Sequence, residues 1–483
     1  MTPQILGALL LGSATALAAA SAPPEPVLPD WASHVGAQSA PPASRVFDAG
    51  AYGAVGDGTT PATAAIQGAI DACAAAGGGV VTLRPGTYLS GALFLKSRVN
   101  LRIDKGVTLL ATLDESAYPI MPTRVAGIEM AWPAGLINVD NQEDVEVSGG
   151  GSIDGRGDFW WKKYWTLRRS YEPRGIRWAA DYDCQRVRLV VVFNSKDVTV
   201  DGLSLHRSGF WTVQVTYSDR VTVRGVAITD NFAVGGVRGA STDGVDIDSS
   251  RRVLVQACDI DNNDDDICLK AGRDYDGLRV NRPTEYVVIR DCVCRRGGGV
   301  VSIGSETSGG IRHIVAYHDS GIGTNEGVRF KSARTRGGTI EDILILDLSL
   351  TGVHMPFTFD LDWDPSFSYG KIPPGMKDYP SYWSVLTRPV EPPERGYVKF
   401  RDITIASVTA TGCRQIITAS GMAGNPVGPV RWQDISAQGR KAGEIRYARD
   451  WSMKNVRFQT DDGAPVTLAD CDNVAQPAVV RGN

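Results

Sequence analysis

Three consecutive carboxylates stand directly before an apolar run in the stretch NNDDDICLKAG, residues 262–272. They are Asp264, Asp265 and Asp266, and Ile267-Cys268-Leu269 follows them. Aspartate is a poor strand former, and adjacent carboxylates repel one another unless one of them holds a proton. The stretch therefore indicates a site that either binds a cation or uses an acid and a base together.

A further carboxylate, Asp243 in GASTDGVDIDSS, precedes Asp264 by twenty-one residues. Glycoside hydrolysis needs two carboxyl groups, one as acid and one as base. Strand alternation would send Asp264 and Asp265 to opposite faces, so both reach one cleft only if the chain bends or bulges there. The alternative interpretation is a solvated acidic turn, which is the usual meaning of a charge run.

Calcium binding of the EF-hand type is excluded by the spacing. Asp261, Asn263 and Asp265 match the first three ligand positions of such a loop. However, Asp266 stands where the loop needs Gly, and Gly272 stands where it needs Glu. We therefore predict no metal at this stretch.

Short segments of one shape recur along the chain and must position these carboxylates. Each segment has polar residues, then alternating Val and Ile, then a small bend and a second short strand. The clearest copies are SKDVTVDGLSLHRSG from Ser195, SDRVTVRGVAITDN from Ser218, SSRRVLVQACDIDNN from Ser249 and PTEYVVIRDCVCRRG from Pro283. The aligned Val198, Val221 and Val253 lie 23 and 32 residues apart. Repeats at such spacing indicate a solenoid, in which stacked units form one long core.

Short strands without helices between them favour an all-β parallel β-helix over a doubly wound sheet. A sandwich or a propeller is the alternative, but the repeat lacks a blade-like period. The exception is TTPATAAIQGAIDACAAAG, residues 59–77, where Ala65, Ile66, Ala69, Ile70 and Cys73 have helical spacing. We expect a short N-terminal helix there that caps the open end of the solenoid.

The chain has 483 residues, 43% hydrophobic and 22% charged, with a net charge of -4. This mild acidity gives no electrostatic reason to expect nucleic acid. Residues 1–22 have the apolar core and small-residue sites of a signal peptide, the alternative being an Ala-rich tail. Residues 23–44 read as a Pro/Ala-rich linker, and we predict one β-helix domain over residues 45–475. No other run is apolar enough for a membrane span.

The eight cysteines are scattered and contain no Cys-x2-Cys pair, which disfavours zinc. Outside the cytoplasm some of them could form disulfides, but the sequence does not give a pairing. Cys258, Cys268, Cys292 and Cys294 lie in strand-like runs. We expect these four to be packed in the core.

Four ordered motifs, together with the opening FDAGAYGAVGDG, give the chain a specific resemblance. The motifs are Ser241-Thr242-Asp243, Asn263-Asp264-Asp265 with the strand to Lys270, Gly297-Gly298-Gly299 before Ser302-Ile303-Gly304-Ser305-Glu306, and Arg329-Phe330-Lys331. Over residues 45–460 the sequence resembles the polygalacturonase family of pectin-degrading glycoside hydrolases, family 28. The resemblance implies a right-handed, pectin-lyase-like parallel β-helix and inverting chemistry.

The resemblance also implies roles for individual residues. Asp264 would be the general acid, and Asp243 and Asp265 would activate water on the opposite face of the sugar. An inverting acid and base stand roughly 6.5–9.5 Å apart, and neighbouring carboxylates raise the pKa of the acid. In the second and third motifs, Lys270 and Glu306 would contact substrate.

Arg329 and Lys331 are two residues apart, so on a strand they share one face. The resemblance implies that they hold the sugar carboxylate beside the scissile bond, and Arg suits a carboxylate because its fork binds both oxygens. Without the other motifs they would read as two cations on an exposed strand.

The chain departs from the family pattern at three positions. Gly298 replaces a His that supports the acid, and family members that act on rhamnogalacturonan also lack this His. The change implies an altered subsite or reduced catalysis. Ser241 replaces Asn, which is milder because both side chains bond to the backbone. Asp266 stands where the family has Ala or Cys, and we assign it no role.

Residues 159–188 form an insert rich in aromatic and basic side chains. Insertions in solenoids form loops on one face, often the binding face. We expect this insert to be a cleft wall in which Trp161 and Trp165 stack on sugar, and a wall that blocks one end would make the enzyme exo-acting. Packing of the loop onto the helix is an alternative that does not exclude this. A second insert, residues 357–383, is expected to border the same cleft.

The sequence thus predicts a secreted or periplasmic, cofactor-free and monomeric hydrolase of α-galacturonosyl linkages in pectin, with exo action favoured over endo. Its partner would be a pectic polysaccharide or oligosaccharide, with no nucleic acid and no membrane. The nearest alternative is a rhamnogalacturonan hydrolase of the same family. A calcium-dependent pectate lyase and a non-catalytic polysaccharide-binding β-helix are more distant alternatives.

Overall fold

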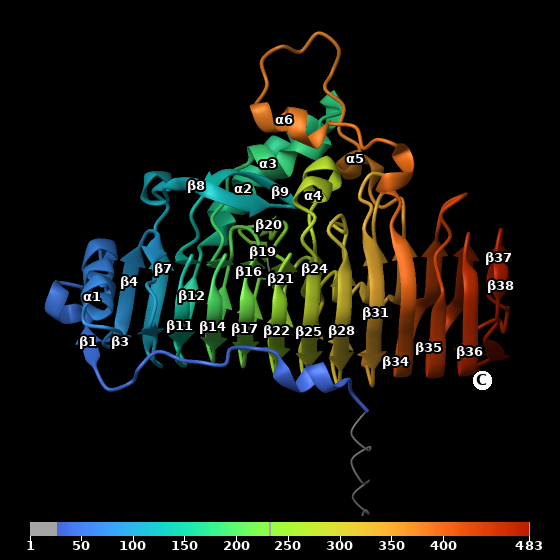
Figure 1. Ribbon diagram of the computed structural model, residues 1–483, viewed down its shortest axis with the longest axis horizontal. Helices are drawn as coiled ribbons and strands as arrows, with labels where there is room; N and C mark the ends of the chain where they lie inside the picture. The colour runs from blue at the N-terminus through green and yellow to red at the C-terminus, as the bar shows by residue number, and fades with distance from the viewer. Residues whose placement is uncertain (1–26, 231–232, 483) are drawn as a thin grey trace, which may run out of the picture.

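The computed structural model of the chain describes residues 27–230 and 233–482. The predicted signal segment, residues 1–22, lies outside these residues. The chain winds into a long parallel β-helix, with an N-terminal helix at one end and C-terminal strands at the other (Figure 1). The all-β, right-handed parallel β-helix expected from the sequence is confirmed.

Three parallel strand ladders run the length of this β-helix. The first contains β1 Val46–Asp48, β3 Gly79–Thr82, β6 Val99–Arg102, β11 Glu143–Ser148, β14 Lys196–Asp201, β17 Asp219–Arg224, β22 Arg251–Gln256, β25 Thr284–Arg290, β28 Ile311–Tyr317, β31 Thr339–Leu346 and β38 Asp472–Val474. The second contains β2 Asp57–Pro61, β4 Gly86–Ser90, β7 Val107–Ala111, β12 Ser152–Asp154, β15 Ser204–His206, β18 Ala227–Thr229, β23 Asp259–Asp261, β26 Val293–Arg295, β29 Ser320–Ile322, β32 Ser349–Thr351 and β39 Ala478–Arg481.

The third ladder positions the candidate site. It contains β5 Leu93–Phe94, β10 Ile137–Asp140, β13 Val190–Phe193, β16 Val213–Thr216, β21 Val245–Asp248, β24 Ile267–Lys270, β27 Gly299–Ile303, β30 Glu326–Lys331, β33 Met355–Asp360 and β37 Thr467–Ala469. The long strands β34 Lys399–Ser420, β35 Val430–Arg446 and β36 Arg449–Thr460 pass from one ladder to the next and join the three.

Aliphatic side chains stack in register inside the coils. Val198, Val221 and Val253 are direct partners on consecutive strands of the first ladder, as the repeat predicts. Val287 and Ile314 continue the same column. Because each unit buries its apolar face only against its neighbours, this column makes the stack one continuous core.

The predicted capping helix is present as α1, Thr63–Ala75, and closes the N-terminal end of the coils. Ile66, Ala69, Ile70 and Cys73 are buried against the first strands, whereas Ala65 is only partly buried. The helix thus covers apolar side chains that would otherwise face water at the open end.

The described part of the expected linker, residues 27–44, is a packed strap and not a free connection. It contains the short 3-10 helix η1, Asp30–His34, and runs beneath the first ladder toward the N-terminal end (Figure 1). Trp31 packs edge-on to Tyr286. The backbone N–H of Gln38 donates to Asp197 at 2.9 Å. The Pro/Ala-rich composition did not reveal these contacts.

Most of the remaining elements gather above the middle of the β-helix (Figure 1). They are the hairpin β8 Ile120–Val125 and β9 Ile128–Pro133, the hairpin β19 Ala233–Val234 and β20 Val237–Arg238, and the helices α2 Gly157–Tyr171, α3 Ala180–Asp183, α4 Asp274–Val280, α5 Pro365–Ser368 and α6 Ser381–Leu386. Short 3-10 helices are η2 Ala49–Tyr52, η3 Glu115–Ala117, η4 Glu172–Arg174, η5 Arg177–Ala179 and η6 Pro393–Gly396. No helix among the described residues has the length and apolarity to cross a membrane.

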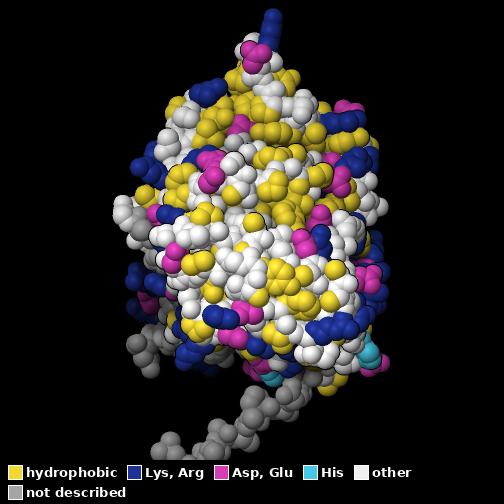
Figure 2. Space-filling model, turned by 90° about the vertical axis from the view of Figure 1, so that its left-hand side faces the viewer, with side chains coloured by type: hydrophobic (Ala, Val, Ile, Leu, Met, Phe, Trp, Pro, Cys, Tyr) yellow, Lys and Arg dark blue, Asp and Glu magenta, His cyan; other side chains and the backbone are white. Residues whose placement is uncertain are grey.

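All eight cysteines are free thiols. Cys258, Cys268, Cys292 and Cys294 are buried, as expected from their strand-like surroundings. Viewed from the N-terminal end, the surface intersperses Lys and Arg with Asp and Glu (Figure 2). This face therefore resembles an ordinary mixed-charge protein surface and not a single-sign patch.

Candidate active site

The third ladder arranges polar side chains in rows, because partners on parallel strands point to the same side. One row consists of Asp246, Cys268, Ser302, Arg329 and Thr358. Lys270 and Lys331 stand two residues farther along their own strands than Cys268 and Arg329, so they belong to the next row on the same face. The in-register stacking of the coils therefore brings motifs that are far apart in the sequence onto one surface.

The carboxylates lie in the turns that precede these strands. The N–H of Gly244 donates to the carbonyl of Asp265 at 2.9 Å, so Asp243 and Asp265 occupy neighbouring coils, as their spacing predicts. The chain bends at Asn263 and Asp264 before β24 begins. This bend allows Asp264 to line a pocket while Asp265 is buried behind the lining, and it is the irregularity that the sequence required.

Asp265 is fully buried and surrounded by donors. Arg329 approaches one carboxylate oxygen at 3.1 Å, and Lys331 approaches the other at 2.5 Å. The Ser302 hydroxyl also donates to the carboxylate, at 2.7 Å. Burial raises the pKa of Asp265, but Lys331 and Arg329 lower it more, so the pKa lies well below its usual range. Asp265 is therefore ionised.

Lys270 lies among three carboxyl groups. Its Nζ is 3.3 Å from Glu306, 3.5 Å from Asp246 and 3.6 Å from Asp243. It also lies over the ring of Trp211, 4.7 Å from the centroid. Burial raises the pKa of Glu306, but Lys270 and nearby arginines lower it more, to about 2, so Glu306 is the charged partner of Lys270.

The other carboxyl groups of the site hold their protons more tightly. Burial raises the pKa of Asp264, and the charge of Asp265 raises it further. Burial, with Asp246 and Asp264, raises the pKa of Asp243 well above its usual value. The pKa of Asp246 is raised to about 8, chiefly by burial. The site thus combines an ionised carboxylate with proton-holding neighbours, which is what acid–base chemistry requires.

Asp243, Asp264, Lys270 and Glu306 line a partly open hollow of about 80 Å³, which we call the aspartate pocket, whereas Asp265 and Asp246 lie outside its lining. It is lined by Ala126, Arg177, Asp181, Phe210, Trp211, Ser241, Asp243, Asp264, Lys270, Ser305, Glu306, Lys331, Trp363 and Phe367. The lining includes residues of both expected inserts, 159–188 and 357–383. Residues of both inserts therefore line this pocket.

The β8–β9 hairpin covers the third ladder on the N-terminal side of the aspartate pocket. Arg124 of the hairpin pairs with Asp248 of β21 at 3.2 Å. Gln214 of β16 donates to the Arg124 carbonyl at 2.9 Å. The hairpin turn accepts the N–H of Arg273 at the Gly127 carbonyl, at 2.9 Å. The hairpin therefore covers this side of the sheet, which the sequence analysis did not predict.

The two tryptophans expected to stack on sugar do not line the aspartate pocket. Trp161 is fully buried, and its indole N–H donates to the Ser208 carbonyl at 2.8 Å. It packs α2 onto the coils, so its assignment to substrate was wrong. Trp165 lies farther along α2 and donates to the Arg238 carbonyl at 3.0 Å, outside the aspartate pocket.

Two departures from the family pattern adjoin the aspartates. A Cβ on Gly298 would lie 3.0 Å from the Asp264 carbonyl carbon and 3.1 Å from the Asp265 nitrogen, so any side chain there would press on both residues. Asp266 points away from the pocket, beside Gly297, and neither of its carboxyl oxygens has a hydrogen-bond partner. Burial raises its pKa well above the usual value.

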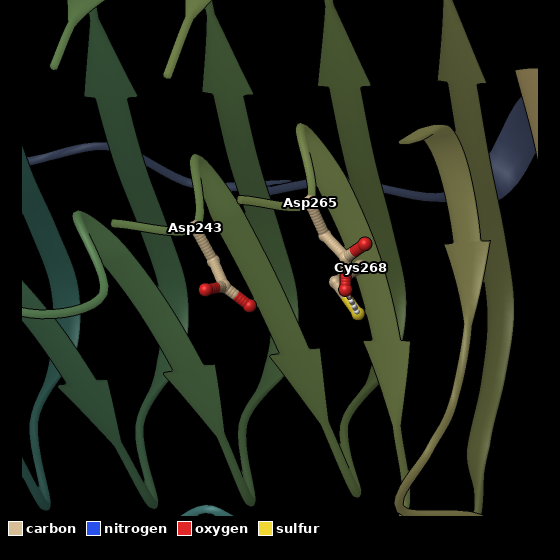
Figure 3. Close-up of side chains that lie close together, drawn as sticks. All are labelled: Asp243, Asp265 and Cys268. Atoms are coloured by element: carbon tan, nitrogen blue, oxygen red, sulfur yellow. Dashed lines mark hydrogen bonds between the residues drawn. The ribbon is translucent and has the colours of Figure 1, made fainter. Parts of the chain in front are cut away.

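Asp243, Asp265 and Cys268 are the one group of described residues whose donor atoms, all within 4.8 Å of each other, could hold a metal ion (Figure 3). The Cys268 thiol donates to Asp265 at 3.4 Å, and burial raises its pKa well above the usual value. A metal ligand would have to be the thiolate, and Lys331 already neutralises Asp265. The donor chemistry therefore disfavours a metal here.

Several residues of the site escaped the sequence analysis. Asp246 could have been found, because Val245 to Asp248 alternates apolar and acidic residues on one strand. Arg177, which pairs with Asp181 at 2.7 Å, comes from a helical insert whose contacts have no local signature. Ser241 donates to the same Asp181 carboxylate at 3.0 Å, which connects the insert to the first motif.

Fold and site together define a parallel β-helix protein with carboxyl groups and cations gathered at one pocket. Residues 82–376 match the model of the family described as Glycosyl hydrolases family 28. The match covers more than half of the chain, and the chain belongs to this family.

Curated relatives carry related names. The chain is 30% identical over 318 residues to a probable polygalacturonase of Vitis vinifera, covering 63% of this chain and 61% of that protein. It is 28% identical over 331 residues to an exo-poly-alpha-D-galacturonosidase of Dickeya chrysanthemi, covering 62% of this chain and 54% of that protein. The chain thus matches less than two thirds of the length of these relatives.

Solved structures show the same fold. An exopolygalacturonase from Thermotoga maritima superposes with a TM-score of 0.72 at 21% identity, covering 93% of this chain and 97% of that one. A family 28 exopolygalacturonase from Yersinia enterocolitica superposes with a TM-score of 0.67 at 20% identity, covering 89% and 78%.

Proposed function

We propose that this protein is a glycoside hydrolase that removes terminal galacturonosyl units from pectin with inversion. The observation that carries the proposal is the aspartate pocket, which is lined by Asp264, a carboxyl group with a raised pKa, next in sequence to ionised Asp265. The names of the relatives from Vitis vinifera and Dickeya chrysanthemi support this choice of substrate.

In the proposed reaction, Asp264 donates its proton to the glycosidic oxygen as the bond to the anomeric carbon breaks. A water molecule attacks that carbon from the opposite face, and Asp265, with Asp243 beside it, accepts the proton of the water. One bond forms and one breaks in a single step, so the configuration inverts. The raised pKa of Asp264 and the lowered pKa of Asp265 suit these opposite roles.

The substrate carboxylate is proposed to bind Arg329 and Lys331. Both cations lie against Asp265 and beside the ring of Trp363, with Lys331 at 4.6 Å from the ring centroid. A uronate at this point would share these cations and would leave Asp265 freer to accept a proton. A planar guanidinium also favours a carboxylate over a neutral sugar.

Exo action is proposed because the pocket is closed on the N-terminal side. The β8–β9 hairpin covers the ladder there, and Ala126 at its turn lines the pocket. A polymer that continued past the reactive sugar would meet this hairpin. A chain end would not.

The test is to incubate the purified protein, with chelator present, separately with homogalacturonan and with rhamnogalacturonan I oligosaccharides. Products would be identified by chromatography and mass. Saturated galacturonic acid from homogalacturonan, released without a rapid fall in viscosity, is the expected result. Release from rhamnose-containing chains alone would transfer the assignment to the rhamnogalacturonan alternative, which Gly298 in place of His favours.

Two further outcomes would refute hydrolysis. An unsaturated product that absorbs ultraviolet light and needs calcium would indicate a lyase. Binding without any product, in the native protein as in Asp264→Asn, would indicate a polysaccharide-binding protein.

We also propose that the protein is a secreted or periplasmic monomer, supported by the signal-like pattern of residues 1–22 and by the self-contained core. Cell fractionation and light scattering would test this.

A further inference from the structure

A second hollow lies between α2 and the β19–β20 hairpin, outside the aspartate pocket. It has a volume of about 240 Å³ and is lined by Lys162, Trp165, Arg169, Gly236, Val237 and Arg238. No residue lines both hollows. Lys162, Trp165 and Arg169 share one face of α2, because they lie three and seven residues apart.

The charge of this hollow is one-sided. Its lining holds three cations and no Asp or Glu. Among the described residues, Lys162, Arg169 and Arg238 have no carboxylate within ion-pair distance, whereas their neighbours Lys163 and Arg168 pair with Glu115 and Glu172. A group of cations without carboxylate partners attracts an anion.

Trp165 gives the hollow an apolar surface. Its indole N–H is satisfied by the Arg238 carbonyl at 3.0 Å, which ties α2 to the hairpin. Tyr164 meets its ring at an angle, with centroids 5.2 Å apart, and Arg168 lies 5.3 Å from its centroid. The ring is thus held in place and partly exposed. A fixed aromatic ring beside cations suits a ligand that has both a ring and a negative charge.

The hollow is structurally continuous with the wall of the aspartate pocket. Tyr164 lies under the guanidinium of Arg186, 4.1 Å from the ring centroid. Arg186 donates to the Ala240 carbonyl at 2.6 Å, and the next residue, Ser241, lines the aspartate pocket. The layer of side chains that contains Tyr164 and Arg186 therefore separates the hollow from the aspartate pocket.

We propose that this hollow, lined by Lys162, Trp165, Arg169 and Arg238, is a uronate-binding surface site that holds a segment of acidic polysaccharide outside the aspartate pocket. Its ligand class rests on the proposed function. A polymer bound there stays near the aspartate pocket between cleavage events, which raises its effective concentration. A short oligosaccharide that fills only the aspartate pocket gains nothing from it.

The test uses affinity electrophoresis through gels containing polygalacturonate, alginate or neutral dextran, with the full chain carrying Asp264→Asn. The double variant Arg169→Glu/Arg238→Glu is expected to bind polygalacturonate about tenfold more weakly. The matched control is Lys454→Glu/Arg457→Glu, the same charge change at two exposed positions of β36, and it should bind like the parent. Equal binding by both double variants would overturn the proposal.

The Trp165→Ala variant tests whether binding needs the aromatic ring or depends on charge alone. It leaves the charge unchanged and is expected to weaken binding severalfold, with a melting scan to confirm folding. If the charge-reversed double variant is retained less by the gel but Trp165→Ala is retained like the parent, the polymer adsorbs through charge alone, and the proposed site is refuted. Retention on alginate as well as polygalacturonate assigns the site to uronate chains in general, and retention on polygalacturonate alone assigns it to galacturonan.

Kinetic measurements distinguish the proposed surface site from the proposed hydrolytic function. With Asp264 restored, the Arg169→Glu/Arg238→Glu variant should raise the KM for the polymer and leave kcat/KM for a trigalacturonate unchanged. Hydrolysis of both substrates with an unaltered polymer KM would refute the surface site alone. Absence of hydrolysis in the native protein would refute the proposed function, while electrophoresis would still report on the surface site.

Discussion

The inside of the first ladder and the outer face of the third ladder are built by the same in-register repeat, but they hold opposite kinds of side chain. Inside, Val253, Val287 and Ile314 stack as aliphatic partners. Outside, Asp265 and Lys331 are equally buried but charged. Burial stabilises the first set by about 0.8 kcal/mol per methylene group, whereas the charges of the second set tolerate burial only because they are paired with each other. Stability and reactivity are therefore assigned to different faces of one scaffold.

Asp265 and Asp266 repeat this contrast within two residues. Asp265 points toward Arg329 and Lys331 and is ionised, whereas Asp266 points away among groups that offer no partner. Neighbours in sequence thus differ in charge state because the chain directs them to different surroundings.

The largest expected effect is on turnover, from Asp264→Asn. If Asp264 is the proton donor, as proposed, its loss should lower kcat on homogalacturonan about a thousandfold, with little change in the melting temperature. The native enzyme should lose activity as pH rises through the raised pKa of Asp264, and initial rates across pH would show this limb. The control is Asp266→Asn, the same change two residues away and outside the pocket. A fall of less than about tenfold in Asp264→Asn would contradict the assignment.

Lys331→Met should affect both stability and turnover. It removes one of the two closest cations from fully buried Asp265, and breaking a buried pair costs about 3 kcal/mol. Thermal and denaturant unfolding would measure this loss. The double variant Lys331→Met/Asp265→Asn should recover most of the stability but none of the activity. If the double variant were as unstable as Lys331→Met, the penalty would lie in packing and not in charge.

The repeat predicts the fold well because each coil of the stack corresponds to one similar segment of the sequence. The valines that align as Val198, Val221 and Val253 are direct structural partners. The motif residues Asp243, Asp264, Lys270 and Lys331 also meet in one pocket. The sequence could not reveal the β8–β9 hairpin or the burial of Trp161, because both depend on how an insert folds back over the coils, which no local pattern encodes.

Ile343→Ala tests the inner face alone. Ile343 is buried in the aliphatic column, with Ile314 and Ile403 as its partners. The cavity should cost about 3 kcal/mol of stability, and calorimetry would show a lower melting temperature. Its kcat on homogalacturonan should match that of the native protein at temperatures well below the transition. A parallel loss of turnover would mean that core packing and site geometry are coupled.

The smallest effect is expected from Asp266→Ala, which removes a buried carboxyl group without a partner. Burial raises the folded-state pKa of Asp266 above its ordinary value of 3.8, so the folded chain keeps a proton that the unfolded chain releases. Stability then falls as pH rises above about 4 until the raised pKa is passed. The variant lacks this loss, so its advantage in the free energy of unfolding should grow with pH, to about 1–2 kcal/mol near neutrality. Asp319→Ala is the control, because burial also raises the pKa of Asp319, to about 8, but its carboxylate accepts the Cys292 N–H at 2.8 Å. Removing that acceptor leaves the buried Cys292 N–H without a partner, which should offset the gain in stability. An advantage for Asp266→Ala that stayed constant with pH would mean that the carboxyl group acts through its volume and not through its proton.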